Sequence, residues 1–154
     1  MKKLILVSSL ALLLVFSFSC KKDDSVSTAT GFSAKVQGTM WTASNSLASH
    51  SSLNNISTIT GLNASGTEQI VLMFIGSGTG TYKMNDDNMG SILINNNLFS
   101  SFMSDIPDGE IIITKYDATN LKISGIFKFK GEDSNGTIYN LTEGKFDNVQ
   151  LVIQ

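Results

Sequence analysis

Apolar and polar residues alternate along most of the chain after residue 31, and this alternation restricts the fold more than any other feature. From Leu121 to Phe129 the odd-numbered residues are apolar or glycine, and most of the residues between them are polar. A period of two indicates a half-buried β-strand. Similar short segments lie at 32–36, 40–43, 56–62, 68–75, 81–84, 91–95, 110–116, 137–141 and 145–153.

Turn-forming residues separate these segments at regular intervals. Clusters of Asn, Asp, Gly and Ser lie at 63–66, 76–80, 117–120 and 133–136. The only helical structure that we expect is one or two turns within 98–105, before the single proline, Pro107. Nine or ten short strands with such spacing predict an all-β domain, either an antiparallel β-barrel or a β-sandwich. Short local hairpins favour a meander-like order.

The first 19 residues have the composition of a secretion signal. Lys2 and Lys3 precede an apolar run of 15 residues from Leu4 to Phe18. That length is typical of a signal peptide and is short for a membrane span, which needs about 20 residues. Ser19 and Cys20 follow, and Cys20 is the only cysteine of the chain.

This pattern resembles bacterial lipoprotein signals, in which a small residue precedes the cysteine that takes a diacylglyceryl group. The resemblance implies that residues 1–19 are removed and that Cys20 carries lipid. Each buried CH₂ contributes about 0.8 kcal/mol to membrane binding, so two or three acyl chains would tether the protein without a spanning segment. The alternative is ordinary secretion with a free Cys20.

The residues after Cys20 are charged and then small and polar. Lys22, Asp23 and Asp24 resemble the signal that directs lipoproteins of Bacteroidota to the outer face of the outer membrane; a solvated tether would have a similar composition. Asp24-Ser25-Val26 resembles a short O-glycosylation signal of that phylum, with Ser25 as the acceptor. We therefore divide the chain into a signal (1–19), a lipidated cysteine with a flexible linker (20–30) and one β domain (31–154).

Charge excludes one class of partner. Removal of Lys2 and Lys3 leaves nine lysines against thirteen acidic residues, and the chain has no arginine. A protein with net negative charge and no arginine binds the phosphate backbone of a nucleic acid poorly. We expect no nucleic acid as a partner.

No group of residues matches a catalytic, metal or nucleotide site. His50 is the only histidine, and we interpret it as a surface residue in a polar stretch. The loops 85–88 and 132–136 are rich in oxygen ligands but lack the spacing of a calcium loop. The glycines of 76–80 are not followed by the lysine and helix of a phosphate loop. We expect no cofactor, no metal and no catalytic residue.

Four aromatic residues are candidates for stacking on a sugar or an apolar ligand: Trp41, Tyr82, Tyr116 and Tyr139. Aromatic residues in such strands more often belong to the core. Our first hypothesis is a non-enzymatic binding or interaction module. The alternative is a lipocalin-like carrier of a small apolar ligand, which would need a large internal cavity.

Several strand segments resemble an uncharacterised family of Bacteroidota lipoproteins with a domain of unknown function. The resemblance implies a β-barrel-like fold and an outer-membrane location. The partners that we expect are the membrane, through lipid on Cys20, and an extracellular protein, a glycan or a small apolar ligand. It implies no reaction. The similar segments are Phe32 to Trp41, Gly80-Thr81-Tyr82, Ile111 to Asp117, Ile123 to Phe129 and Glu143 to Val149.

Overall fold

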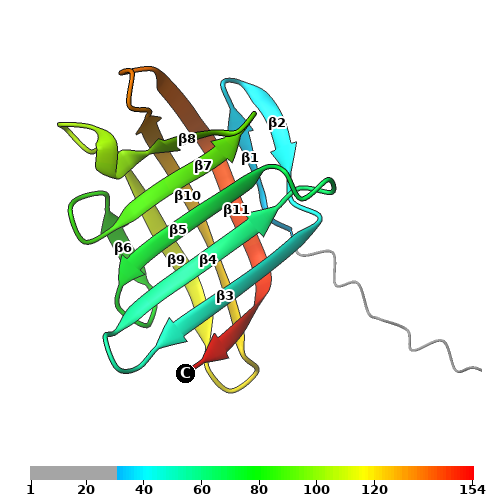
Figure 1. The fold of residues 1–154 in the computed structure, drawn as a ribbon. Helices are drawn as coiled ribbons and strands as arrows, with labels where there is room; N and C mark the ends of the chain where they lie inside the picture. Colours follow the sequence, from blue (N-terminus) through cyan, green and yellow to red (C-terminus); the bar gives the residue numbers. More distant parts are fainter. Residues whose placement is uncertain (1–30) are drawn as a thin grey trace, which may run out of the picture.

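The structure is a computed structural model, and it describes residues 31–154. Eleven β-strands and one 3₁₀ helix make up this part of the chain (Figure 1). The elements are β1 (Ser33–Val36), β2 (Thr39–Thr42), β3 (Asn45–Ser51), β4 (Ile56–Leu62), β5 (Gln69–Ile75), β6 (Gly80–Lys83), β7 (Met89–Ile94), β8 (Asn97–Ser100), η1 (Ser101–Met103), β9 (Gly109–Asp117), β10 (Lys122–Glu132) and β11 (Ile138–Ile153).

The strands form two layers that cross each other steeply (Figure 1). The front layer has the order β3-β4-β5-β7-β8, and the back layer has the order β2-β1-β11-β10-β9-β6. Leu151–Ile153 of β11 pair in parallel with Ala48–His50 of β3, and Glu132 of β10 pairs with Ser100 of β8. These two junctions complete a ring of hydrogen bonds through seven strands, with β1-β2 and β9-β6 as side branches.

The all-β prediction is therefore confirmed, and the arrangement is intermediate between the predicted barrel and sandwich. All strand pairs but β11–β3 are antiparallel. The order is only partly a meander, because β6 pairs with β9 and β1 pairs with β11.

Three strand predictions need correction. Residues 45–51 form β3, which the sequence analysis missed because polar residues hide its alternation. Within 98–105 the predicted helical turns reduce to η1, because the preceding residues pair with β7 through a turn in which Asn95 and Asn96 have φ of 51° and 61°. Segments 137–141 and 145–153 are one strand, β11, which shifts register against β10 near Glu143 and Asn148, two residues with positive φ. Such bulges bend a strand without ending it.

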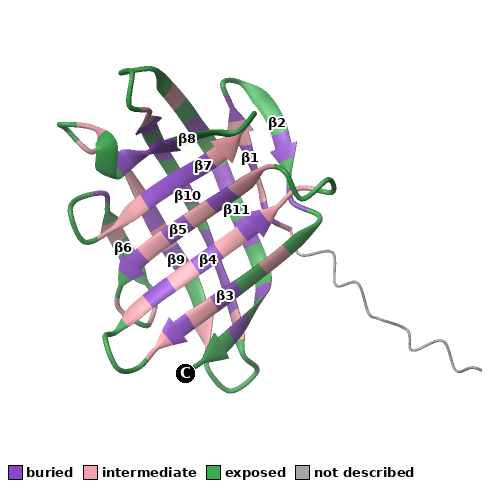
Figure 2. Cartoon of the chain, in the orientation of Figure 1, coloured by how far each residue is buried: buried purple, intermediate pink, exposed green. Residues whose placement is uncertain are grey.

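Buried residues, purple in Figure 2, lie on strands of both layers, and their hydrophobic side chains form one core. Phe32 lies 5.4 Å from Phe127 and 6.1 Å from Phe146, measured between ring centroids. Its ring also reaches the opposite layer at Gly61 of β4, where a Cβ atom would lie 2.7 Å from the ring. Phe129 lies in the same way over Gly90 of β7. Glycines in the front layer thus leave room for aromatic rings from the back layer, and the two layers pack closely at these two contacts.

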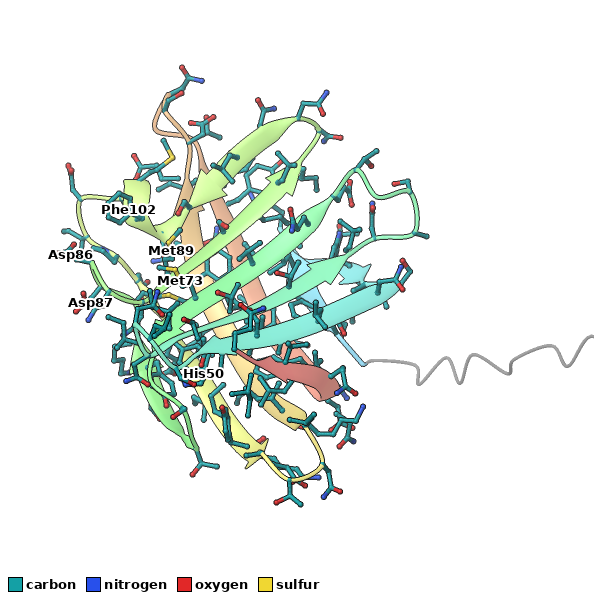
Figure 3. The ribbon with its side chains drawn as sticks, turned by 60° about the horizontal axis from the view of Figure 1, so that its bottom comes forward. His50, Met73, Asp86, Asp87, Met89 and Phe102 are labelled. Atoms are coloured by element: carbon teal, nitrogen blue, oxygen red, sulfur yellow. The ribbon has the colours of Figure 1, made fainter. Side chains whose placement is uncertain are left out.

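Charge is distributed unequally between the layers. No residue of β3, β4, β5, β7 or β8 is aspartate, glutamate, lysine or arginine. On the outer face of this front layer, Met73 and Met89 are cross-strand neighbours (Figure 3). The five ion pairs found within residues 31–154 all join residues of β1, β6, β9, β10 and β11 or the loop before β9. The back layer therefore carries the charged surface.

Candidate functional site

The upper end of the domain, as seen in Figure 1, has a cavity of about 350 Å³ between the β1–β2 hairpin and the front layer. We call it the upper mouth. It opens above the aromatic core, at the place where β2 has no strand partner on its outer edge. Its lining consists of Val36, Gln37, Thr39, Met40, Trp41, Glu68, Ile94 and Tyr139.

Trp41 and Glu68 join the two sides of the upper mouth. The indole Nε1 of Trp41 donates a 2.9 Å hydrogen bond to Oε2 of Glu68. Trp41 is 7% exposed and packs edge-on against Phe32. A buried indole N–H needs such an acceptor, so the carboxylate has a defined position at the rim.

The loop before β5 holds Glu68 in place. The side-chain oxygen of Asn63 accepts hydrogen bonds from the backbone N–H groups of Thr67 and Glu68, at 3.1 and 3.2 Å. The backbone N–H of Asn63 donates in return to the carbonyl oxygen of Glu68 at 3.0 Å. Asparagine side chains stabilise turns in this way. The sequence Asn63 to Glu68 therefore positions the acidic side chain at the start of β5.

Tyr139 forms the opposite wall of the upper mouth. Its ring stacks on Phe99 with centroids 4.0 Å apart, and it remains partly exposed. Gly131, its partner in β10, lies against the backbone of Phe99, where a Cβ atom would be 2.9 Å away. Ile94 is partly buried and Met40 is 62% exposed, so aliphatic side chains complete the rim.

The amide of Gln37 is already engaged. Its Oε1 accepts from the backbone N–H of Asn140 at 3.0 Å, and its Nε2 donates to the carbonyl of Ile138 at 3.3 Å. Gln37 and Gly38 both have positive φ, 48° and 79°, and form the two-residue turn between β1 and β2. Residues of this conformation match the twist of a tight hairpin. Gln37 therefore fixes the hairpin to β11 and has little capacity left for a ligand.

The lower end of the domain contains His50, which is buried and not on the surface as predicted. It lies near the end of β3 (Figure 3), and its Nδ1 is 3.0 Å from Oγ of Ser57. Ser57 Oγ donates its proton to the carbonyl of Gly76 at 2.6 Å. Since a hydroxyl has one proton, the histidine Nδ1–H must donate to Ser57. His50 and Ser57 thus form a structural hydrogen-bond chain. Its direction is opposite to that of a catalytic pair, in which the serine donates its proton to the histidine.

The other two aromatic candidates lie at this lower end. Tyr82 packs on Phe74 with centroids 4.2 Å apart and donates to the carbonyl of Gly78. Tyr116 lies edge-on to His50 at 6.5 Å. Burial raises the pKa of both tyrosines above the ordinary value. Two predicted candidates thus belong to the upper mouth, and two close the other end of the core.

A second depression, of about 340 Å³, lies on the outer face of the back layer. Ile112 and Ile126 form its floor, with charged residues around them. Glu110 contacts Lys83 at 2.7 Å and Lys128 at 3.1 Å, and these ammonium groups hold its pKa below the ordinary value. Both carboxylates of this groove, Glu110 and Glu143, are thus neutralised by lysines, the second by Lys35 at 2.7 Å, which leaves the upper mouth as the better candidate site.

Comparison with known proteins adds a family. The sequence profile of a domain of unknown function, DUF6252, matches residues 28–150. The chain belongs to the DUF6252 family. No curated protein and no solved structure matches it.

The acidic loops of this DUF6252 domain stabilise turns. Asn85 accepts hydrogen bonds from the backbone N–H groups of Asp87 and Asn88, while the side chains of Asp86 and Asp87 point into solvent (Figure 3). Asp133 accepts from the N–H groups of Asn135 and Thr137. Within residues 31–154, no three His, Cys, Asp or Glu side chains gather as a metal site would require. No helix in that range is long and apolar enough to cross a membrane.

Five predicted site residues lie outside the described part of the DUF6252 chain: Cys20, Lys22, Asp23, Asp24 and Ser25. Glu68, Met40 and Ile94, by contrast, line the upper mouth but were not predicted as site residues from the sequence. One signal was available for Glu68, because it is the only charged residue between Lys35 and Lys83. No sequence pattern connects it with Trp41 or Tyr139.

Proposed function

We propose that this protein is a lipid-anchored binding module of the cell envelope and that its ligand binds in the upper mouth. The observation that carries the proposal is a cavity of about 350 Å³ in which Trp41, Tyr139 and Glu68 converge. Ligand sites in proteins are concave, largely apolar and have a few fixed polar groups, with volumes of about 300–1,000 Å³. The upper mouth has these properties.

The packing of the core favours binding at the rim over transport inside a barrel. Phe32, Phe127 and Phe146 occupy the space between the layers. A lipocalin-like carrier would need that space for an apolar ligand. The upper mouth gives a ligand contact with aromatic side chains without opening the core.

The polarity of the lower hydrogen-bond chain supports a non-enzymatic role. A serine nucleophile donates its proton to the histidine that activates it. Ser57 instead donates to Gly76 and accepts from His50. Within residues 31–154 we find no other histidine that could serve as a base.

The membrane location in this proposal rests on the sequence before residue 31. Cys20 follows an apolar run and is the attachment point for lipid, as in the lipoproteins of Bacteroidota. Lys22, Asp23 and Asp24 support display on the outer face of the outer membrane, and Ser25 is a candidate for O-glycosylation. A tether of about ten residues would place the upper mouth near the envelope surface, where an extracellular protein, glycan or small molecule is accessible.

Trp41 is the only tryptophan of the chain, so its fluorescence reports directly on the upper mouth. The experiment uses residues 20–154 with Cys20→Ala, which lack both the apolar run and the lipid and therefore need no detergent. Three probes are titrated: maltose, phenethylamine and decanoate. We expect a saturable change in tryptophan emission with at least one of them.

Two variants assign the response to a site. Ile94→Phe fills the upper mouth, and Ile126→Phe makes the same change in the outer groove of the back layer. The response should be lost in Ile94→Phe and kept in Ile126→Phe. An emission that is unchanged by all three probes, or a response that survives Ile94→Phe, would overturn the proposed function.

A further inference from the structure

We propose that the upper mouth binds an organic cation, namely an amine attached to an apolar body. This inference rests on the proposed function and names its ligand class. It follows from the position of Glu68, the only charged side chain in the lining of the cavity.

No cation of the described chain neutralises Glu68. None of the ion pairs found within residues 31–154 includes it, and the nearest charged residues in the sequence are Lys35 and Lys83. Lys35 is paired with Glu143 and Lys83 with Glu110, both at 2.7 Å. A ligand that covers the mouth would therefore take a lone carboxylate out of water. This is costly unless the ligand supplies the opposite charge.

The carboxylate is held ready for such a partner. Trp41 Nε1–H occupies Oε2, and the Asn63 turn fixes the backbone of Glu68. Within the described residues no hydrogen bond to Oε1 is formed, so this oxygen is available to a ligand. An ammonium group bound there would make a charge-assisted hydrogen bond, which is about twice as strong as a neutral one.

The walls suit the rest of such a ligand. The rings of Trp41 and Tyr139 line the cavity, and aromatic faces attract cations by about 0.5–2 kcal/mol, depending on solvent exposure. Ile94 and Met40 offer aliphatic surface for an apolar body. The cavity thus combines one negative charge, two aromatic rings and an apolar rim.

Other ligand classes fit less well. Glu68 would repel the carboxylate of a fatty acid. A neutral sugar could donate hydroxyl groups to Glu68, but it would leave the charge uncompensated. The amide that would commonly help to bind a sugar, that of Gln37, is already bonded to β11. Charge therefore favours the cation.

The test compares three probes with the same phenyl body and different end groups: phenethylamine, 2-phenylethanol and 3-phenylpropionate. Each is titrated into residues 20–154 with Cys20→Ala and followed by Trp41 fluorescence. We expect phenethylamine to bind about tenfold or more tightly than the alcohol. We expect no saturable response to the carboxylate.

Glu68→Gln removes the charge and keeps a side-chain oxygen for Trp41. We expect it to weaken phenethylamine binding about tenfold or more and to leave 2-phenylethanol binding unchanged. The matched control is Asp117→Asn, which removes a carboxylate at the lower end of β9. It should leave the binding of both probes unchanged.

Salt provides a second measurement that needs no variant. Raising ionic strength from about 0.01 M to about 1 M shortens the screening length from about 30 to about 3 Å. It should weaken amine binding and spare alcohol binding. If Glu68→Gln does not fold, the salt dependence of amine and alcohol binding, measured with Glu68 intact, still tests whether the ligand is a cation.

The outcomes separate the two proposals. Equal affinities for amine and alcohol, with no effect of salt or of Glu68→Gln, would overturn the cation class and leave the upper mouth as a binding site. A response to maltose or decanoate but not to phenethylamine would do the same. No response to any of these probes would overturn both proposals.

Discussion

The indole of Trp41 donates a 2.9 Å hydrogen bond to the carboxylate of Glu68, 27 residues further along the chain. Trp41 belongs to β2, the edge strand of the back layer, and Glu68 immediately precedes β5 of the front layer. No strand pairing joins β2 to β5. This side-chain bond therefore links the two layers at the upper mouth, where the backbone ladder does not.

Removal of that acceptor should destabilise the domain. We expect Glu68→Ala to lower the free energy of unfolding by about 1–3 kcal/mol, because it leaves the buried N–H of Trp41 without a partner. Glu68→Gln retains an oxygen at the same place and should have a smaller effect. Urea unfolding followed by circular dichroism measures both. Equal losses in the two variants would show that the hydrogen bond contributes little.

The contact between Gly61 and Phe32 should tolerate no added methyl group. A Cβ atom at residue 61 would lie 2.7 Å from the Phe32 ring, and this ring is enclosed by the core. We expect Gly61→Ala to cost about 1–3 kcal/mol by overpacking. Thermal unfolding is the measurement.

Two further variants check the cause of that loss. Gly31→Ala is the matched control, because its Cβ would make only an ordinary contact of 3.6 Å with Asp147. Phe32→Leu combined with Gly61→Ala should cost less than the sum of the single changes, since the smaller side chain relieves the clash. Strict additivity of the two substitutions would argue against this packing explanation.

The turn at Asp133 should make the stability depend on pH in the acid range. The backbone N–H of Thr137, followed by that of Asn135, holds the pKa of Asp133 below its ordinary value. A carboxylate with a lowered pKa in the folded state stabilises the fold above its unfolded-state pKa, about 3.9. That contribution is lost as the pH falls through the folded-state pKa.

We therefore expect Asp133→Asn to flatten the decline of stability below about pH 4. The comparison is Asp86→Asn, since the side chain of Asp86 makes no hydrogen bond within residues 31–154. Chemical denaturation at a series of pH values gives both profiles. A decline in Asp133→Asn as steep as in the unsubstituted chain would contradict this role.

Cys20 should decide whether the protein is bound to the membrane. We expect a fatty acid that carries an alkyne tag to label the unsubstituted chain and not the Cys20→Ala chain, because the acyl chains would be missing. Equal labelling of the two chains would refute the lipid anchor.

Protease treatment of intact cells tests which way the anchored protein faces. The unsubstituted chain should be cleaved, and a chain with Asp23→Ala and Asp24→Ala should be protected if these residues direct export to the surface. Protection of the unsubstituted chain until the outer membrane is breached would place it in the periplasm.

The class of the fold could be predicted because strand periodicity is a local property. Segments such as 121–129 and 110–116 alternate clearly, and the structure has strands there. The strands at 45–51 and 97–100 were not predicted, because their polar residues hide the period of two. Burial in the fold nevertheless alternates along β3. The Asn95-Asn96 turn was the available signal for β8, since asparagine tolerates positive φ.

The sequence by itself determined the strand-rich domain, its separation from an apolar N-terminal run and the position of the only cysteine. Each of these follows from composition or from spacing along the chain. Only the tertiary structure decided that Trp41, Glu68 and Tyr139 share a cavity and that His50 is buried. These residues are brought together by pairing between distant strands, and that pairing depends on which side chains fill the core at the contact of Phe32 with Gly61.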